Sequence, residues 1–117
     1  MLSFSTNMQI YLCTAPTDMR KSYDGLTALV ASSMSKDVLS GHLFLFLNRR
    51  RDRIKLMYWD RDGLAIWMKR LQAGTFETPK AGVDQPCLEL DATQLAMLLT
   101  GVSLESAKRR KRFALAS

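Results

Sequence analysis

The stretch from Gly41 to Leu71 constrains the fold of this chain more than any other part. It contains three largely apolar runs separated by two short charged turns, and it reads GHLFLFLNRRRDRIKLMYWDRDGLAIWMKRL. Apolar runs of this length predict β-strands, and tight polar turns between them predict hairpins. The run 43–47 is apolar at every position, which is typical of a central strand covered on both faces. The sequence therefore predicts two back-to-back hairpins at the centre of the fold.

The two predicted turns differ in chemistry. The first contains the run 49–51, three consecutive arginines that the flanking strands hold at a defined edge of the sheet. The second spans 60–63, where aspartates bond local backbone N–H groups and Gly63 adopts a positive φ. Asp60 and Asp62 also resemble a magnesium-binding pair, because Mg²⁺ takes carboxylate oxygens as ligands. The turn is the simpler interpretation, since Asp and Gly are common turn residues.

Shorter patterns on either side complete the predicted domain. We expect one helix at 22–33, with its N-cap at 17 or 18, and a second helix that begins at a capping box over 91–94 and ends at Gly101. Further strands are expected at 9–14, 75–78 and 88–90. Together these elements predict an α+β fold, an antiparallel β-meander sheet of about four to five strands packed with two helices.

The length of the chain indicates one domain. Its 117 residues suffice for one hydrophobic core and are too few for two independent ones. We expect a flexible lead-in at 1–8, a single α+β domain at 9–104 and a basic, disordered tail at 105–117. No apolar run approaches the length of a membrane span, and no export signal is visible, so we expect no membrane partner and a cytoplasmic location.

Positive charge is concentrated in two segments. The net charge is +6, and the runs 49–51 and 108–112 hold eight of the 17 Lys and Arg residues, so the other nine face 11 acidic residues. Phosphate contacts dominate the non-specific affinity of proteins for nucleic acid. A nearly neutral body with two basic segments therefore indicates a polyanionic partner. The alternative is a solvated basic turn and a tail that keep the protein soluble.

Candidate catalytic or metal-binding residues are few. Cys13 and Cys87 are far apart in the sequence and show no CxxC spacing, so neither a zinc site nor a disulfide framework is predicted. His42, the single histidine, stands at the entrance of a strand, where a structural role is expected. No combination of Cys, His and acid suited to nucleophilic catalysis is evident. We therefore expect no enzymatic activity, no metal and no cofactor.

Three separated blocks of the chain resemble a known family. They are TDMRKSYDGLTALV at 17–30, SGHLFLFLNRRRDRIKLMYWDRDGLAIWMKRLQAGTF at 40–76 and LELDATQLAMLLTGV at 88–102. In this order they resemble the small accessory protein called TnpB of the sixty-six family of bacterial insertion sequences. The resemblance implies a protein encoded in a mobile element beside a separate transposase, which carries the catalytic triad. It also implies an accessory role in transposition; the run 108–112 departs from the family pattern.

The predicted function depends on the first hairpin. We expect this accessory protein to bind DNA, at the ends of the element and with low sequence specificity, or to bind an assembly of DNA with the transposase. Guanidinium groups bind phosphate oxygens through two parallel hydrogen bonds. The residues expected to contact nucleic acid are Arg49, Arg50, Arg51, Arg53, Lys55, Arg20 and Lys21. The alternative for Arg20 and Lys21 is an interaction with nearby acidic side chains, and the sequence does not decide between the two.

The alternative function is a protein-interaction module that binds the transposase without contacting DNA. Its interface would be an apolar face of the sheet that contains Met57, Trp59 and Trp67, because aromatic residues and Met are enriched at such interfaces. Core packing is a further interpretation of both tryptophans. The sequence does not decide the oligomeric state or the step of transposition that the protein assists.

Overall fold

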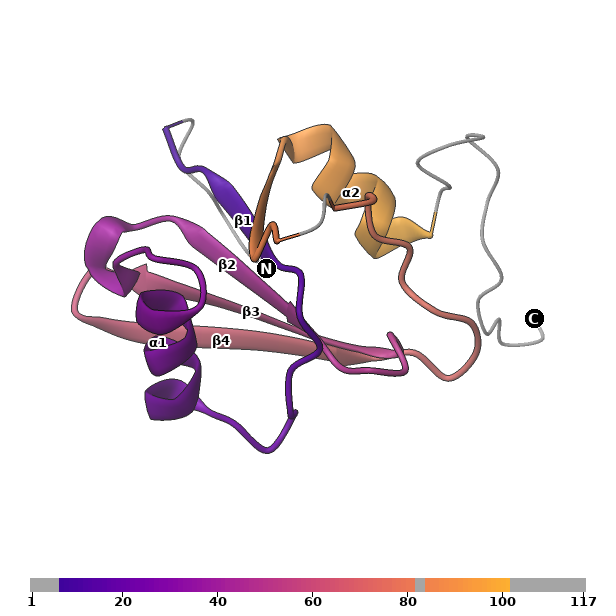
Figure 1. Ribbon diagram of the computed structural model, residues 1–117, viewed down its shortest axis with the longest axis horizontal. Helices are drawn as coiled ribbons and strands as arrows, with labels where there is room; N and C mark the ends of the chain where they lie inside the picture. Colours follow the sequence, from indigo (N-terminus) through magenta and orange to yellow (C-terminus); the bar gives the residue numbers. More distant parts are fainter. Residues whose placement is uncertain (1–6, 82–83, 102–117) are drawn as a thin grey trace.

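A five-stranded sheet with one α-helix on each face forms the fold (Figure 1). The computed structural model describes residues 7–81 and 84–101. In chain order its elements are β1 (Ile10–Cys13), α1 (Tyr23–Ser32), the short 3₁₀ helix η1 (Val38–Ser40), β2 (Leu43–Leu47), β3 (Arg53–Asp60), β4 (Gly63–Arg70), β5 (Cys87–Leu90) and α2 (Ala92–Thr100). This architecture confirms the predicted α+β class.

The sheet is mixed, with strand order β4-β3-β2-β1-β5. Strands β2, β3 and β4 form the predicted antiparallel meander, in which Leu45 lies opposite Leu56 and Leu56 lies opposite Trp67. Strand β1 pairs in parallel with β2, placing Leu12 beside Leu45, and β5 pairs antiparallel with β1. The parallel pair was not predicted. It requires a crossover connection between its two strands, and α1 lies in that connection.

Strand β2 is buried on both faces, as its unbroken apolar run predicts. Its even-numbered side chains, Phe44 and Phe46, belong to a cluster that includes Leu26 and Val30 of α1. Alternate side chains of a strand point to opposite faces, so the odd-numbered side chains of β2 form the other core. Helix α1 thus covers one face of the central strand.

Helix α2 and the segment after β4 cover the second face. Leu95 and Leu98 of α2 and the fully buried Phe76 pack with the odd-numbered side chains of β2. The strand predicted at 75–78 is wrong, because this segment has no strand pairing in the structure. It is an irregular segment instead, and it contributes the buried Phe76 to the core on the α2 side.

The helix ends follow local side-chain chemistry at α2 but not at α1. Asp91 accepts a hydrogen bond from the N–H of Gln94 (2.7 Å), and the Gln94 side chain accepts one from the Asp91 N–H (2.9 Å), which confirms the predicted capping box. Gly101 ends α2 with a φ of 88°. The N-cap of α1 is Ser22, whose side chain makes no capping bond, so the cap predicted at 17 or 18 is wrong.

The turn between β3 and β4 forms at the predicted residues with a different backbone conformation. Asp60 and Gly63 are paired at its ends, as a tight hairpin requires. The positive φ belongs to Arg61 (54°) and not to Gly63. Within 7–81 and 84–101, no three His, Cys, Asp or Glu residues are grouped to hold a metal ion. The same residues include no helix with the length and apolar character needed to cross a bilayer.

Candidate nucleic-acid interface

The turn between β2 and β3 is held in one conformation by the side chain of Asn48. Its Oδ1 accepts hydrogen bonds from the N–H groups of Asp52 (3.1 Å) and Arg53 (3.0 Å), and its Nδ2 donates to the Asp52 carboxylate (2.6 Å). The carbonyl of Asn48 also accepts from the N–H of Arg51 (3.1 Å). Arg51 has a φ of 59°, a conformation uncommon for residues other than glycine. Hydrogen bonds on both sides of Arg51 therefore fix the turn.

The backbone of this turn is also bonded to the segment that follows β4. The carbonyl of Arg51 accepts from the N–H of Phe76, and the carbonyl of Asp52 accepts from the N–H of Leu71, both at 2.7 Å. Leu71 and Phe76 are buried in the core on the α2 side. Because its backbone is attached to core residues, the turn presents its side chains from a rigid base.

The arginine side chains of the turn are exposed. Residues 49–51 and Arg53 all have exposed side chains. Among the described residues, the ion pairs join Arg20 to Asp18 and Arg61 to Asp60, and none involves these four arginines.

The one acidic residue of the turn does not form an ion pair with them. The pKa of Asp52 is lowered, chiefly by the hydrogen bond from Asn48, and the positive charges of Arg50 and Arg53 act in the same direction. The Asp52 carboxylate is thus ionised and bonded to an amide, which leaves the guanidinium groups available.

The pairing of β3 with β4 adds two basic residues that we did not predict. Arg53 lies opposite Arg70, and Ile54 lies opposite Lys69, which is also exposed. Counting back from the tight turn at 60–63 would have found both, because that turn fixes the register of the whole hairpin. We call the resulting group the basic sheet end. It consists of Arg49, Arg50, Arg51, Arg53, Lys69 and Arg70.

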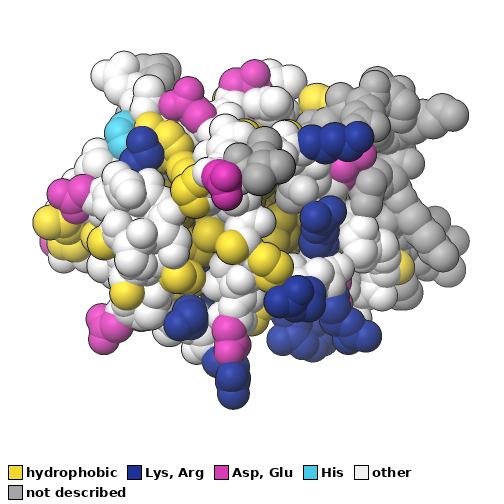
Figure 2. All heavy atoms as spheres, viewed as in Figure 1, with side chains coloured by type: hydrophobic (Ala, Val, Ile, Leu, Met, Phe, Trp, Pro, Cys, Tyr) yellow, Lys and Arg dark blue, Asp and Glu magenta, His cyan; other side chains and the backbone are white. Residues whose placement is uncertain are grey.

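The surface view agrees with this grouping. Figure 2 shows Lys and Arg side chains gathered at the lower right of the molecule, over the end of the sheet where the chain passes from β2 to β3 in Figure 1. The opposite end of the β3–β4 hairpin carries acidic as well as basic residues, namely those of the 60–63 turn. Positive charge is therefore concentrated at one end of the sheet.

Two depressions flank the turn between β2 and β3, residues 48–52, which we call the arginine turn. The smaller, of about 420 Å³, is lined by residues 17–20, Asn48, Arg49, Arg50 and Arg53. The larger, of about 720 Å³, lies between the ends of β1 and β2, the arginine turn and residues 77–81. Arg49 lines both. A side chain at this position can reach a ligand in either depression.

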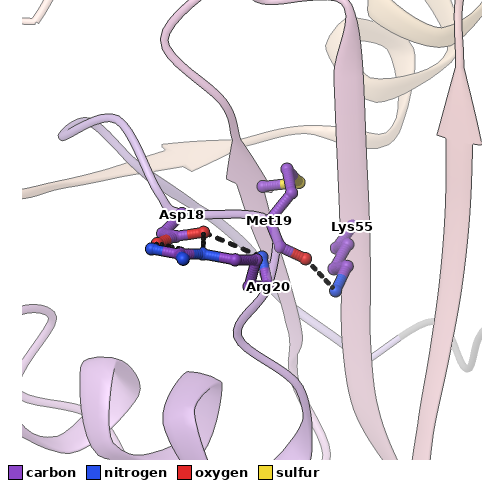
Figure 3. Close-up of polar contacts among 4 residues, drawn as sticks. All are labelled: Asp18, Met19, Arg20 and Lys55. Atoms are coloured by element: carbon purple, nitrogen blue, oxygen red, sulfur yellow. Dashed lines mark hydrogen bonds and ion pairs between the residues drawn. The ribbon is translucent and has the colours of Figure 1, made fainter.

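Arg20, for which the sequence leaves open the basic surface or a pairing with a nearby acidic side chain, is paired within the molecule. Its Nε and Nη2 donate to the Asp18 carboxylate at 3.0 and 2.6 Å, as Figure 3 shows. The hydrogen bond from the Arg20 side chain is the main reason that the pKa of Asp18 falls to about 2. A phosphate contact by Arg20 would have to replace this bidentate pair. Arg20 lies at the rim of the smaller depression but is already engaged.

Lys55 is not available for a nucleic-acid contact in this structure. It is buried, with 7% of its surface exposed, and its ammonium group donates to the backbone carbonyls of Met19 (2.8 Å) and Lys21 (2.7 Å). Figure 3 shows the ammonium group directed at the Met19 carbonyl. The prediction that Lys55 contacts DNA is corrected accordingly: its role is to hold the 19–21 segment against β3. The side chain of Lys21 remains exposed.

The three residues predicted to form an apolar interface do not share a face. Met57 is fully buried in the cluster beneath α1. Trp67 lies opposite Leu56, which belongs to the α2-side core, whereas Trp59 lies opposite Leu64, which packs on the α1 side. Directly opposite residues share a face, so the two tryptophans lie on opposite faces. The structure corrects the prediction of a single face, and Met57 is a core residue.

His42 has a structural contact. Its Nδ1 accepts a hydrogen bond from the N–H of Gln9 (3.0 Å), and its ring packs edge-on against Tyr11. The basic run at 108–112 lies outside the described residues.

Comparison with known proteins identifies the family. Residues 8–109, which include every described strand and helix, match the family described as IS66 Orf2 like protein. Two relatives are from Sinorhizobium fredii. The uncharacterized protein y4jC is 32% identical over 110 residues, covering 94% of this chain and 92% of its own length. The uncharacterized protein y4hO is 30% identical over 102 residues, covering 87% of each.

No solved structure matches the chain. The family match covers most of the sequence, and the resemblance of its three sequence blocks is thereby confirmed. The chain belongs to the IS66 Orf2-like family, whose members are accessory proteins of transposition.

Proposed function

We propose that this protein assists transposition by binding DNA through the basic sheet end, either directly or within an assembly with the transposase of the same element. The observation that supports this proposal most strongly is the state of the arginine turn. Its backbone is fixed by hydrogen bonds to Asn48, Leu71 and Phe76, while its guanidinium groups are exposed and make no ion pair among the described residues. Because the backbone of the turn is already fixed, binding has to order only the arginine side chains.

The arrangement suits a backbone contact better than base reading. The six basic residues come from the β2–β3 turn, the start of β3 and the adjacent end of β4, and neighbouring strands are about 4.8 Å apart. The guanidinium and ammonium groups are therefore spread over an area and can neutralise several phosphates at once. No recognition helix is placed beside them among the described elements. We expect low sequence specificity and strong salt dependence.

The smaller depression supports a phosphate contact beside the turn. Arg49, Arg50 and Arg53 line it. Arginines are common ligands of phosphate oxygens in protein–DNA complexes, so three of them around one depression favour a phosphate there.

The mechanism that we propose is architectural. The protein would hold the ends of the element or bridge them to the transposase by neutralising phosphate charge, and bond breakage would belong to the transposase. We place this activity in the bacterial cytoplasm. Incubation of the purified chain with labelled element ends and Mg²⁺ should leave the DNA uncut.

The alternative, a module that binds the transposase without DNA, has lost much of its structural basis. It depended on one apolar face with three members, of which one is buried and the other two lie on opposite faces. An interface with the transposase at the basic sheet end remains compatible with the proposal, because Arg is also enriched at protein interfaces.

A binding experiment separates these readings. Labelled duplexes of the element ends and of a shuffled sequence are titrated with the purified protein, alone and with the transposase, at several salt concentrations. The proposal predicts salt-sensitive binding of both duplexes by the protein alone. The interaction module would be favoured if DNA is bound only when the transposase is present, and if the salt dependence of that binding equals the salt dependence of the transposase alone.

A further inference from the structure

We propose that Cys13 and Cys87 form a site of reversible disulfide formation that ties the edge strand β5 to β1. The two residues are far apart in sequence but directly opposite each other in the antiparallel β1–β5 pair. Both are free thiols in the structure. This inference does not rest on the proposed function, because it uses the pairing of β1 with β5 and none of the basic residues, although Cys13 also lines the larger depression.

The hydrogen-bond pattern shows which kind of antiparallel pair the cysteines form. Opposed residues alternate between pairs that exchange backbone hydrogen bonds and pairs that do not. The N–H of Thr14 donates to the carbonyl of Pro86 (3.1 Å), so the next opposed pair along the strands is a bonded one. The cysteine pair is therefore a non-hydrogen-bonded pair.

The other side of β1 leads to the same conclusion. The carbonyl of Gln9 accepts from the N–H of Leu43 in β2 (2.9 Å). Odd-numbered residues of β1 thus direct their backbone groups toward β2 and away from β5. Cys13 is one of these residues, so two independent hydrogen bonds assign the same pattern.

This pattern brings the two side chains close together. The Cα atoms of a non-hydrogen-bonded antiparallel pair are about 4.5 Å apart, within the range of roughly 4.4–6.8 Å that disulfides bridge. Both side chains lie on the α1 side of the sheet, since Cys13 belongs to that core cluster and Cys87 packs against it. A disulfide can therefore form without a shift in the register between β1 and β5.

The exposure of the two thiols indicates the order of reaction. Cys87 is partly exposed, whereas Cys13 is 4% exposed. With a small-molecule disulfide as oxidant, the Cys87 thiolate attacks one sulfur of the oxidant and releases the first thiolate. Cys13, after losing its proton, then attacks the Cys87 sulfur, and the second thiolate leaves. The two cysteines lose two electrons, the oxidant is reduced to two thiols, and the two protons go to those thiols.

Burial raises the pKa of the Cys87 thiol, while the positive charge of Lys36 acts in the opposite direction. The thiolate fraction at neutral pH is accordingly small, so the first step is expected to be slow.

The consequence of the disulfide is mechanical. Strand β5 has four residues, forms one edge of the sheet and leads directly into the N-cap of α2. The disulfide would close the long loop that contains α1, β2, β3 and β4 and would restrict the unfolded chain. We expect the melting temperature to rise on the order of 10 °C.

The test uses the unmodified protein. Reduced native protein is incubated with oxidised glutathione, quenched with acid and alkylated, and its intact mass and melting temperature are measured. The chain has two cysteines, so a monomer that has lost two hydrogen atoms and takes up no alkylating agent must contain this bond. We expect that product, with the higher melting temperature, and its reversal by dithiothreitol.

Two single variants serve as controls. Cys13→Ala should stop at a glutathione adduct on Cys87, and Cys87→Ser should leave a thiol that reacts only after unfolding. Three results would overturn the proposal: a stable glutathione adduct on the unmodified protein, dimers linked between chains, or two thiols that both remain alkylatable. If the internal disulfide forms but the melting temperature does not change, the claim that the bond stabilises the attachment of β5 to β1 is wrong.

Discussion

The salt dependence of DNA binding should report the phosphate contacts of the basic sheet end. We consider the triple change of Arg49, Arg50 and Arg53 to Gln. These three residues are exposed, make no ion pair among the described residues and line one depression. Arg51 is left in place because its positive φ of 59° makes a substitution there a change of backbone strain as well as of charge.

The expected effect follows from counterion release. Each phosphate contact contributes about 0.9 to the slope of log affinity against log salt, so three contacts contribute about 2.7. At about 0.1 M salt this corresponds to a loss of about 500-fold in affinity, or about 3.7 kcal/mol of binding free energy. This is the upper limit, reached if all three guanidinium groups contact phosphates. The loss should be similar for element ends and for shuffled duplex.

The assay is fluorescence anisotropy with labelled duplex at salt concentrations between about 50 and 200 mM. Arg61→Asn is the control, because Arg61 is an exposed arginine at the opposite end of the β3–β4 hairpin and asparagine tolerates its positive φ of 54°. It should leave the slope nearly unchanged, and so should Arg20→Gln, since Arg20 is already paired with Asp18. If the folded triple variant keeps the slope of the unmodified protein, the reasoning about the arginine turn is wrong. If the Arg61 variant changes the salt slope by as much as the triple variant does, the change reports the net charge of the protein and not contacts of the arginine turn.

Three other variants test individual contacts. Lys55→Met should lower the free energy of unfolding by about 2 kcal/mol in urea, because two carbonyls lose a charged donor, while the salt slope stays the same; a reduced slope would restore Lys55 to the DNA contact. Asn48→Ala should cost about 2 kcal/mol through its three side-chain hydrogen bonds, and unchanged stability would show that the turn does not need them. The pKa of Asp18, measured by NMR, should be about 2 and should rise toward 3.8 in Arg20→Gln. Because the pKa of Asp18 is lower in the folded state than in the unfolded state, the ion pair stabilises the protein above about pH 4. This stabilisation disappears as the pH falls toward 2, and the stability of Arg20→Gln should not show that decrease.

The parts of the fold that depend on residues close together in the sequence were predictable. The apolar run in β2 indicated burial on both faces, and the capping box at Asp91 and Gln94 fixed the start of α2. The parallel pairing of β1 with β2 was not predictable, because strand order depends on competition among all strands. The cover of the second face was missed for the same reason: Phe76 packs among core residues far from it in the sequence, and its N–H donates to the carbonyl of Arg51.

The site shows the same division. The arginines of the turn follow from the sequence, since the strands on either side are strongly apolar. Lys55 was misassigned because strand alternation gives the face of a side chain but not whether another segment covers that face. The 19–21 segment does so, and its carbonyls accept from the Lys55 ammonium group. Arg70, in contrast, was within reach of the sequence, since the tight turn at 60–63 determines which residue lies opposite Arg53.

The arginines of the basic sheet end are not required by the fold. The contacts that hold the turn come from its backbone, from Asn48 and from the carboxylate of Asp52, and none of these needs a guanidinium group. Arg53 also lies opposite Arg70, and like charges directly opposite each other in a sheet are destabilising. Elsewhere in the same protein an exposed arginine is paired with a carboxylate two residues away. The attraction of Arg50 and Arg53 to the Asp52 carboxylate is the one contribution to the fold noted for these guanidinium groups. Because it involves two of the six basic residues and like charges oppose it, we attribute the cluster to a polyanionic partner.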